Sequence, residues 1–293
     1  MVAARRLSDM DLSLFELRGK SALVTGASMG LGRACATALA MTGANVAVLD
    51  IDESSAVKTV EKLRSRGVDS FFVHCDVSNK AQVRAAVAAV VARFGRLDIA
   101  INNAGFGIPV GGSENLAQEE WNRVIGINLT GVFLCAQAEA QQMINQEPTQ
   151  GKIINIASMY GSVAGGNCAY NAAKAGVIHL TKTLAAEWGR FNINVNCISP
   201  SWVMTRRMMH LSEEVRSRMR AVTPMGHIQR PEDMFGPVIF LASQASNFVT
   251  GHDLLVDGGH TVNTWLSPLE RTLAPRVTPE EEIFDTAQDA DDP

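Results

Sequence analysis

Short β-branched runs alternate with longer helical patterns along most of this chain, and this alternation constrains the fold more than any other feature. Most runs are apolar at successive positions, so strands formed from them need cover on both faces. A parallel sheet with helices on both sides provides that cover, and right-handed crossovers wind it doubly. The expected strands are Ser21–Thr25, Asn45–Asp50, Ser70–Cys75, Asp98–Asn102, Lys152–Ala157, Ile193–Ile198 and Asp253–Val256. Helices are expected over about 30–42, 54–66, 79–94, 117–146, 170–190 and 231–244.

The sequence predicts one domain, because no linker rich in Pro, Gly or Ser divides its 293 residues. An N-terminal arm over residues 1–16 leads into the α/β domain over residues 17–261. Within it, residues 201–227 carry Trp202 and five methionines where no regular helix is expected; they predict a mobile lid, with helix packing as the alternative. Residues 262–293 form an extension whose acidic end predicts a solvated, mobile tail.

Composition excludes several classes of function. The formal net charge is −4 and the Lys and Arg residues are scattered, so neither nucleic acid nor an anionic membrane is expected as a partner. The five cysteines form no Cys-x-x-Cys pair, which predicts free thiols in a reducing cytoplasm and no metal site. No apolar run of about 18 residues occurs, and charges interrupt the stretch Met1–Lys20, so we expect a soluble cytoplasmic protein without a signal peptide.

A glycine-rich turn follows the first expected strand and runs directly into a helix. The segment Thr25–Gly32 has the sequence TGASMGLG. Its glycines let the backbone approach a pyrophosphate, and the free N–H groups of a helix start attract the negative charge. The segment also fits the Gly-x-Ser-x-Gly elbow of hydrolases around Ser28, but none of the six histidines lies in a recognisable triad context. We therefore expect a dinucleotide site, with an ordinary glycine-rich turn as the alternative.

The second expected strand ends on Asp50, at the distance past the glycines expected for a carboxylate that binds the adenosine ribose hydroxyls. The alternative role is capping of the next helix by Asp50 or Asp52, but Ser54 is equally placed to serve as that cap, which leaves Asp50 free. The charge of Asp50 repels a 2′-phosphate. No Lys or Arg stands at Met29, Ile51 or Asp52 to bind such a phosphate, so NAD is expected rather than NADP.

Further polar groups lie near the carboxyl ends of other expected strands, where ligands bind open parallel sheets. Asp76–Val77 is expected near the adenine, with helix capping as the alternative. Asn102–Gly105 offers amides and a close backbone approach to the cofactor, and Ser158 could hold a substrate oxygen. Asn128 lies inside a helical pattern, where an amide favours a polar task, and a structural hydrogen bond is an equal alternative.

Tyr170 and Lys174 lie four residues apart in an expected helix, which places a phenol and an ammonium on one face. A free tyrosine has a pKa of about 10. We expect the neighbouring cation to lower the pKa of Tyr170, so that the phenol can serve as a general acid and base. Alone, this spacing is also typical of an ordinary surface face. Its weight comes from Ser158 and the other polar strand ends.

In order and spacing, these motifs resemble the short-chain dehydrogenase/reductase family over about residues 17–261. The resemblance implies a single Rossmann-fold domain with a doubly wound, seven-stranded parallel sheet and helices on both faces, and a homotetramer built through the long helices. In the implied catalytic tetrad, Asn128 holds a water that links Lys174 to a proton relay. The tetrad is Asn128, Ser158, Tyr170 and Lys174.

The resemblance also implies the cofactor contacts. Ser201 departs from the family's common Pro-Gly pair after the sixth strand, and a serine there restricts the loop from which Val203 and Thr205 are expected to contact the nicotinamide. The expected cofactor residues are Gly26, Ser28, Met29, Gly30, Leu31, Asp50, Ile51, Asp76, Val77, Asn103, Ala104, Gly105, Tyr170, Lys174, Pro200, Val203 and Thr205.

The predicted function is hydride transfer between NAD(H) and a secondary alcohol or its ketone, with Tyr170 as acid and base. The stretch Ser158–Thr205 is most similar to family members that act on sugars, polyols or related hydroxy-acids. The expected substrate residues are Tyr160, Asn167, Trp202 and Met204. One alternative is a 3-oxoacyl-thioester reductase of the same family; these usually prefer NADPH, so Asp50 counts against it. A non-catalytic NAD-binding regulator is the other, and the complete tetrad counts against it.

Overall fold

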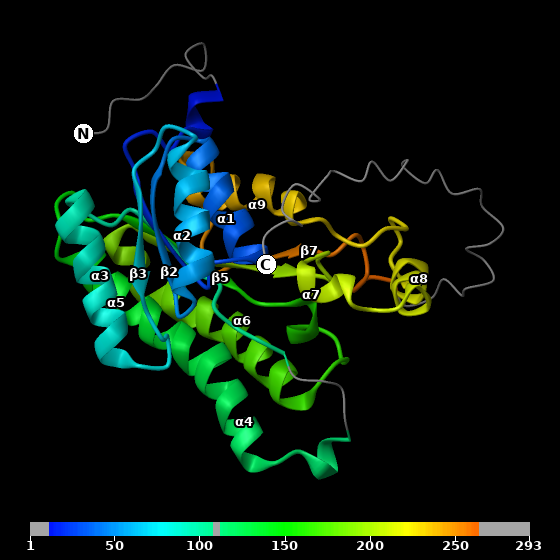
Figure 1. Cartoon of the computed structure of the whole chain (residues 1–293). Helices are drawn as coiled ribbons and strands as arrows, with labels where there is room; N and C mark the ends of the chain where they lie inside the picture. The colour runs from blue at the N-terminus through cyan, green and yellow to red at the C-terminus, as the bar shows by residue number, and fades with distance from the viewer. Residues whose placement is uncertain (1–11, 108–111, 264–293) are drawn as a thin grey trace.

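The computed structural model describes residues 12–107 and 112–263. Seven strands form one parallel sheet in the order β3-β2-β1-β4-β5-β6-β7 (Figure 1). The strands are β1 (Ser21–Thr25), β2 (Asn45–Asp50), β3 (Ser70–His74), β4 (Ile99–Asn102), β5 (Gly151–Ile156), β6 (Ile193–Pro200) and β7 (Asp253–Val256). The chain runs outward from β1 to β3 and then from β4 to β7, so the carboxyl ends of β1 and β4 flank a crevice of the kind that binds ligands. The predicted doubly wound sheet is confirmed.

Helices cover both faces of the sheet (Figure 1). One apolar core lies between the sheet and α1, α2 and α9; a second lies between the sheet and α3, α5 and α6. Strands β1 and β4 are buried at every position, which agrees with the apolar residues at their centres. These helices are α1 (Gly30–Met41), α2 (Glu53–Arg64), α3 (Lys80–Phe94), α5 (Val132–Ile144), α6 (Cys168–Trp188) and α9 (Phe235–Ala242).

The expected helix over 117–146 consists of three segments. α4 (Gln118–Ile125) passes into a π-helical turn, η4 (Gly126–Gly131), and then into α5. Such turns widen the helix and are frequent at functional sites. A Cβ at Gly131 would lie 2.9 Å from Cγ2 of Val77, so the missing side chain lets this turn pack closely on the segment after β3.

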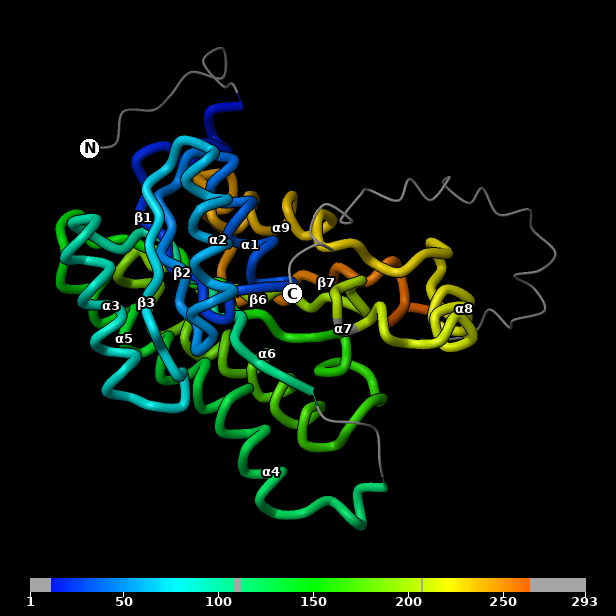
Figure 2. Tube along the Cα trace, in the orientation of Figure 1, coloured from blue at the N-terminus to red at the C-terminus, as the bar shows by residue number. Residues whose placement is uncertain are grey.

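The expectation of no regular helix within residues 201–227 is wrong. The segment contains α7 (Arg206–Met209) and α8 (Glu213–Val222), and Figure 2 shows α8 standing out beside α7. Apolar periodicity fails to reveal α8 because its signals are polar. Ser212 caps it by accepting a 3.4 Å hydrogen bond from the backbone N–H of Val215, and acidic residues fill its first turn.

Short helical turns complete the described chain. They are η2 (Leu12–Phe15), η3 (Ser113–Asn115), η5 (Met159–Gly161), η6 (Gly189–Phe191), η7 (Pro231–Met234) and η8 (Gln244–Ser246). All five cysteines are free thiols. Across residues 12–107 and 112–263, no helix has the length and apolar character needed to cross a membrane. In the same residues, no group of three or more His, Cys, Asp or Glu side chains could hold a metal ion. Most of the predicted N-terminal arm and nearly all of the acidic extension lie outside the described residues.

Candidate active site

The glycine turn between β1 and α1 is packed so closely that side chains are excluded from it. Gly26 and Gly30 have φ angles of +63° and +55°, in the left-handed region that glycine adopts most readily. A Cβ at Gly32 would overlap the carbonyl oxygen of Gly26 and the side-chain nitrogen of Asn103. The N-cap residue of α1 is Met29, which provides no side-chain hydrogen bond. The first N–H groups of α1 are therefore available to an anionic ligand.

Asn103 holds this turn in place. Its side-chain nitrogen donates hydrogen bonds to the carbonyl oxygens of Thr25 (2.9 Å) and Gly26 (3.1 Å), and its backbone N–H donates to Oγ1 of Thr25 (2.9 Å). The backbone N–H of Ala104 also donates to that hydroxyl, at 3.0 Å. Asn103 was expected to contact the cofactor, but both N–H groups of its side chain are already hydrogen-bonded to the glycine turn. Gly105 lies against Asn128, since a Cβ there would be 2.5 Å from Oδ1 of Asn128.

Asp50 anchors the turn from the neighbouring strand. Its carboxylate accepts hydrogen bonds from the backbone N–H groups of Ser28 (2.9 Å), Ile51 (2.8 Å) and Asp52 (3.0 Å). The expectation that Ser54 can serve as the helix cap is wrong, because Asp52 caps α2 by accepting from the backbone N–H of Ser55. α2 begins at Glu53, so Ser54 already lies within its first turn and donates its own hydroxyl to Asp52.

Sequence reasoning missed Arg33 as a second anchor of Ser28. The guanidinium donates to the carbonyl oxygen of Ser28 from Nε (3.1 Å) and Nη2 (2.7 Å), and Oγ1 of Thr59 donates to the same oxygen at 2.8 Å. Ser28 is only 2% exposed. This burial counts against the hydrolase elbow, which presents an exposed nucleophile at a sharp turn.

The other residues expected to bind the cofactor differ in exposure. Met29 and Ile51 are 51% and 65% exposed, whereas Val77, expected near the adenine, is buried and Leu31 is partly buried against the core. Asp76 accepts hydrogen bonds from the backbone and hydroxyl of Ser78. It does not cap α3, because that cap is Asn79, whose side chain accepts from Ala81 and Gln82.

Tyr170 and Lys174 face each other in the first turns of α6. Nζ of Lys174 lies 5.5 Å from the centroid of the Tyr170 ring and donates a 2.7 Å hydrogen bond to the carbonyl oxygen of Ile156, the last residue of β5. Burial lowers the pKa of Lys174 to about 8. The helix begins here because Asn167 caps it, accepting from the backbone N–H of Ala169 at 3.0 Å. Asn167 was expected to contact the substrate, but its side-chain oxygen instead accepts the capping hydrogen bond of α6.

Ser158 and Asn128 belong to two turns, η5 and η4, that contact α6. Ser158 is buried just after β5, and its Oγ accepts from the backbone N–H of Tyr160 at 3.2 Å. Asn128 lies in the π-helical turn, which packs against α6. Its Nδ2 donates to the carbonyl oxygens of Phe106 (2.9 Å) and Val124 (3.1 Å), whereas its buried Oδ1 has no partner among the described residues. That oxygen could accept a hydrogen bond from a water.

Three rings line the adjoining edge of the sheet. Nε1 of Trp202 donates a 3.1 Å hydrogen bond to the hydroxyl of Tyr160, and the Trp202 ring centroid lies 4.8 Å from that of His260. Burial raises the pKa of the Tyr160 phenol, against the effect of that hydrogen bond. The three residues follow the carboxyl ends of β5, β6 and β7, so they share the edge with Ser158. Sequence reasoning missed His260, although its position directly after a strand and a Gly-Gly pair was a usable signal.

The loop after β6 closes toward the glycine turn. A Cβ at Gly30 would lie 3.6 Å from Cγ2 of Thr205, so the two loops meet. Oε1 of Gln229 accepts from the backbone N–H of Ser201 at 3.1 Å, and Val203 forms a parallel bridge with Gln229. The backbone N–H of Met204 donates to the carbonyl oxygen of Gln229 at 2.8 Å. The loop that starts at Pro200 is thus fixed by Gln229, with serine in place of the family's glycine.

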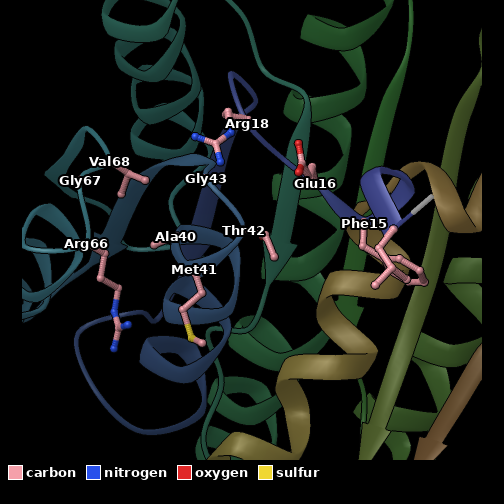
Figure 3. A pocket seen from close by; sticks show the side chains of 11 residues that line it. Phe15, Glu16, Arg18, Ala40, Met41, Thr42, Gly43, Arg66, Gly67 and Val68 are labelled. Carbon is pink, nitrogen blue, oxygen red and sulfur yellow. The ribbon is translucent and has the colours of Figure 1, made fainter.

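A separate cavity lies far from these residues. Figure 3 shows its lining, which includes Phe15, Arg18, Met41 and Arg66. The lining segments precede β1, β2 and β3, so the cavity lies at the amino ends of the strands, opposite the edge that carries Tyr170 and Asp50.

Comparisons with known proteins agree with the observed fold. Residues 26–261 match a family model described as enoyl-(acyl carrier protein) reductase. The chain is 40% identical over 266 residues to a D-threitol dehydrogenase of Mycolicibacterium smegmatis, covering 89% of this chain and 100% of the relative. It is 39% identical to a 3-oxoacyl-(acyl-carrier-protein) reductase FabG of Staphylococcus aureus, covering 82% and 97%. A gluconate 5-dehydrogenase from Burkholderia cenocepacia, solved in complex with NADP and tartrate, superposes with a TM-score of 0.80 at 36% identity, covering 86% and 98%.

Proposed function

The chain belongs to the short-chain dehydrogenase/reductase family of nicotinamide-dependent oxidoreductases, and on that premise we propose that it transfers a hydride between NAD(H) and a secondary alcohol or its ketone. One observation carries the proposal. Nζ of Lys174 lies 5.5 Å from the centroid of the Tyr170 ring and is bonded to the carbonyl oxygen of Ile156 at the carboxyl end of β5, two residues before the buried Ser158. A phenol, a cation and a hydroxyl donor in one place are the groups that proton exchange with a carbinol oxygen requires.

The glycine turn fits a dinucleotide. The uncapped start of α1 would hold the pyrophosphate, Asp50 the adenosine ribose, and Val203 and Thr205 the nicotinamide end. Met29 and Ile51 would flank the adenosine, with Asp76 and Val77 beside the adenine. When bound, the nicotinamide supplies the acceptor or donor of the hydride.

The chain's own residues supply the proton chemistry. In alcohol oxidation, the Tyr170 phenolate accepts the proton of the substrate hydroxyl, and in ketone reduction the phenol returns a proton to the same oxygen. The Lys174 ammonium stabilises the phenolate through its field. Ser158 donates a hydrogen bond to the substrate oxygen and orients it. Asn128 offers its unpartnered Oδ1 to a water that connects Lys174 with solvent.

We propose a sugar, a polyol or a related hydroxy compound as substrate. The dehydrogenase names of two similar proteins, for D-threitol and gluconate, support this class. The hydroxyl of Tyr160 accepts from Trp202 and keeps its own proton to donate to a substrate oxygen, while the rings of Trp202 and His260 can pack on carbon-bound hydrogens. Met204 and the rest of residues 201–227 would cover the bound substrate as a lid.

NAD is the proposed cofactor rather than NADP. Asp50 would repel a 2′-phosphate, and Nε and Nη2 of the nearby Arg33 are already bound to Ser28 and Thr59. The similar gluconate 5-dehydrogenase was solved with NADP, so the choice requires a direct measurement. We also propose a cytoplasmic homotetramer; five free thiols support the compartment and the family resemblance supports the assembly.

A 3-oxoacyl-thioester reductase is the second candidate, and the 39% identical FabG supports it. Both candidates share Tyr170 and differ in substrate. Turnover should be followed by nicotinamide absorbance over polyols, hydroxy-acids and acyl-thioester ketones with each cofactor, after thermal shifts with NAD and NADP. We expect a larger shift with NAD and turnover of a polyol or hydroxy-acid. Tyr170→Phe should bind NAD normally and lose at least about 100-fold in turnover. Near-native turnover of this variant would contradict the assignment.

A further inference from the structure

A carboxyl group on α5 is buried without a cation beside it. Glu139 is 1% exposed and faces the sheet, and the residues that the structure describes form no ion pair with it. Its Oε2 accepts a 3.0 Å hydrogen bond from Nδ2 of Asn102, the last residue of β4. A buried charge without a partner is strongly disfavoured, and such a group usually becomes neutral. In agreement, burial raises the pKa of Glu139 to about 8, against the effect of the Asn102 hydrogen bond.

In the part of the chain that the structure describes, the side-chain oxygen of Asn102 lacks a hydrogen-bond donor, and the O–H of a neutral Glu139 would supply one. Both N–H bonds of its side chain are used, because Nδ2 donates to Glu139 and to Oδ1 of Asn155, each at 3.0 Å. Its Oδ1 is buried and has no donor among the described residues. Native proteins rarely leave such an oxygen unpaired. A protonated carboxyl group has one O–H to donate and one oxygen to accept, which complements a primary amide.

We infer that Glu139 is a neutral carboxylic acid in the folded protein, paired with Asn102 through one hydrogen bond in each direction, and that this pair is a positioning device for the cofactor turn. The connection is short. Asn103 follows Asn102 directly, and its side chain holds the carbonyl oxygens of Thr25 and Gly26. Loss of the Glu139 proton would remove the donor to Asn102 and leave a bare charge at the end of β4.

The titratable side chains next to Glu139 keep their protonation state over the pH range in which Glu139 ionises. Cys135 on the same helix and Cys75 after β3 are the titratable side chains that interact with it. Burial is the main cause that raises the pKa of both thiols, that of Cys75 to about 11. The charge of Asp76 and then that of Glu139 add to the effect on Cys75, and the charge of Glu139 adds to that on Cys135, so both thiols are neutral where Glu139 ionises. From β5 and α6 the described residues that continue this network are neutral: Asn155 accepts from Asn102 and donates to Oγ1 of Thr181 at 2.9 Å.

Glu139→Gln is the first test, because a carboxamide reproduces the neutral acid and cannot ionise. Folded Glu139 keeps a proton that the unfolded chain releases above the ordinary pKa of 4.5. The unfolding constant of the wild type, divided by that of Glu139→Gln, should therefore rise by about tenfold per pH unit from about pH 5 to 8. The exposed Glu187→Gln serves as the control and should follow the wild type. A ratio that stays flat with pH would overturn the neutral-acid assignment.

Infrared spectroscopy gives a readout independent of folding. The difference spectrum between wild type and Glu139→Gln should contain the C=O stretch of a protonated carboxylic acid below pH 7, and should lose it well above pH 8. A carboxylate band in the acidic sample would contradict the inference. Both measurements use the full chain without substrate, so their outcome does not depend on the proposed reaction.

The positioning role rests on the proposed function, because it concerns the cofactor. Glu139→Met keeps a side chain of similar length but leaves the Asn102 amide without its partner. At about pH 7, we expect Glu139→Gln to bind NADH like the wild type and Glu139→Met to bind about tenfold more weakly. Wild-type affinity in Glu139→Met would refute the positioning role, whereas failure of NADH to bind the wild type would refute the proposed cofactor.

Discussion

Substitution of Gly32 by alanine tests the packing of the glycine turn most sharply. The new methyl group would overlap the carbonyl oxygen of Gly26 and the side-chain nitrogen of Asn103. Neither atom can withdraw freely, because they are hydrogen-bonded to each other and Asn103 also holds Thr25. Overpacking of this kind costs about 1–3 kcal/mol. If that cost falls on the binding-competent turn, NADH affinity should drop by about 5- to 150-fold.

The assay is a fluorescence titration with NADH, accompanied by thermal unfolding to confirm that the variant folds. Gly189→Ala is the matched control, because Gly189 has helical angles (φ −55°, ψ −34°) at the end of α6 and a Cβ there would meet nothing within 4 Å. Alanine suits a helical backbone better than glycine, so this control should gain about 0.5–1 kcal/mol of stability and bind NADH unchanged. Wild-type NADH affinity in Gly32→Ala would refute the argument that close packing shapes the turn.

Further predictions concern charge and recognition. Burial lowers the pKa of Lys174 from 10.5 to about 8, so between these two pH values the unfolded chain holds more protons than the folded one. The free energy of unfolding should therefore rise with pH, by up to about 1.4 kcal/mol per pH unit. In urea titrations, Lys174→Met should remove that rise. Asp50→Ala should weaken NAD binding and raise the ratio of NADP to NAD affinity, and an unchanged ratio in calorimetry would contradict the ribose assignment. Trp202→Phe removes the donor to Tyr160 and should raise the substrate KM several-fold with kcat nearly kept, whereas an equal loss in kcat would indicate a role in the chemical step.

The fold could be predicted from the sequence because, in most strands and helices, the apolar pattern and the flanking turn residues indicate the same element. Strands such as Ser21–Thr25 and Asp253–Val256 have the expected bounds, since apolar runs between turn residues leave few alternatives. α8 was missed because capping and charge, rather than apolar spacing, define it. The π-helical turn at Gly126–Gly131 was also not expected, because it depends on packing against Val77, which is distant in sequence.

The site was predictable only where its residues act through local spacing. The pairing of Tyr170 with Lys174 needs only one helical turn, so the sequence contains it. The clamp of Arg33 on Ser28 and the pair of Glu139 with Asn102 join groups from different elements, and no local pattern marks either contact. An arginine after a glycine motif or a glutamate in a helix is ordinary in sequence. Only burial and the unpartnered oxygen of Asn102 distinguish the second pair.

Both backbone polar groups of Ser28 are hydrogen-bonded to side chains of other segments. Its N–H donates to Asp50, and its carbonyl oxygen accepts from Arg33 and Thr59. A segment restrained in this way keeps its shape before any ligand arrives, so little conformational entropy remains to be lost on association. Hydrogen exchange at these amides should then be slow in the free protein and change little on saturation, while the gain in protection concentrates in residues 201–227.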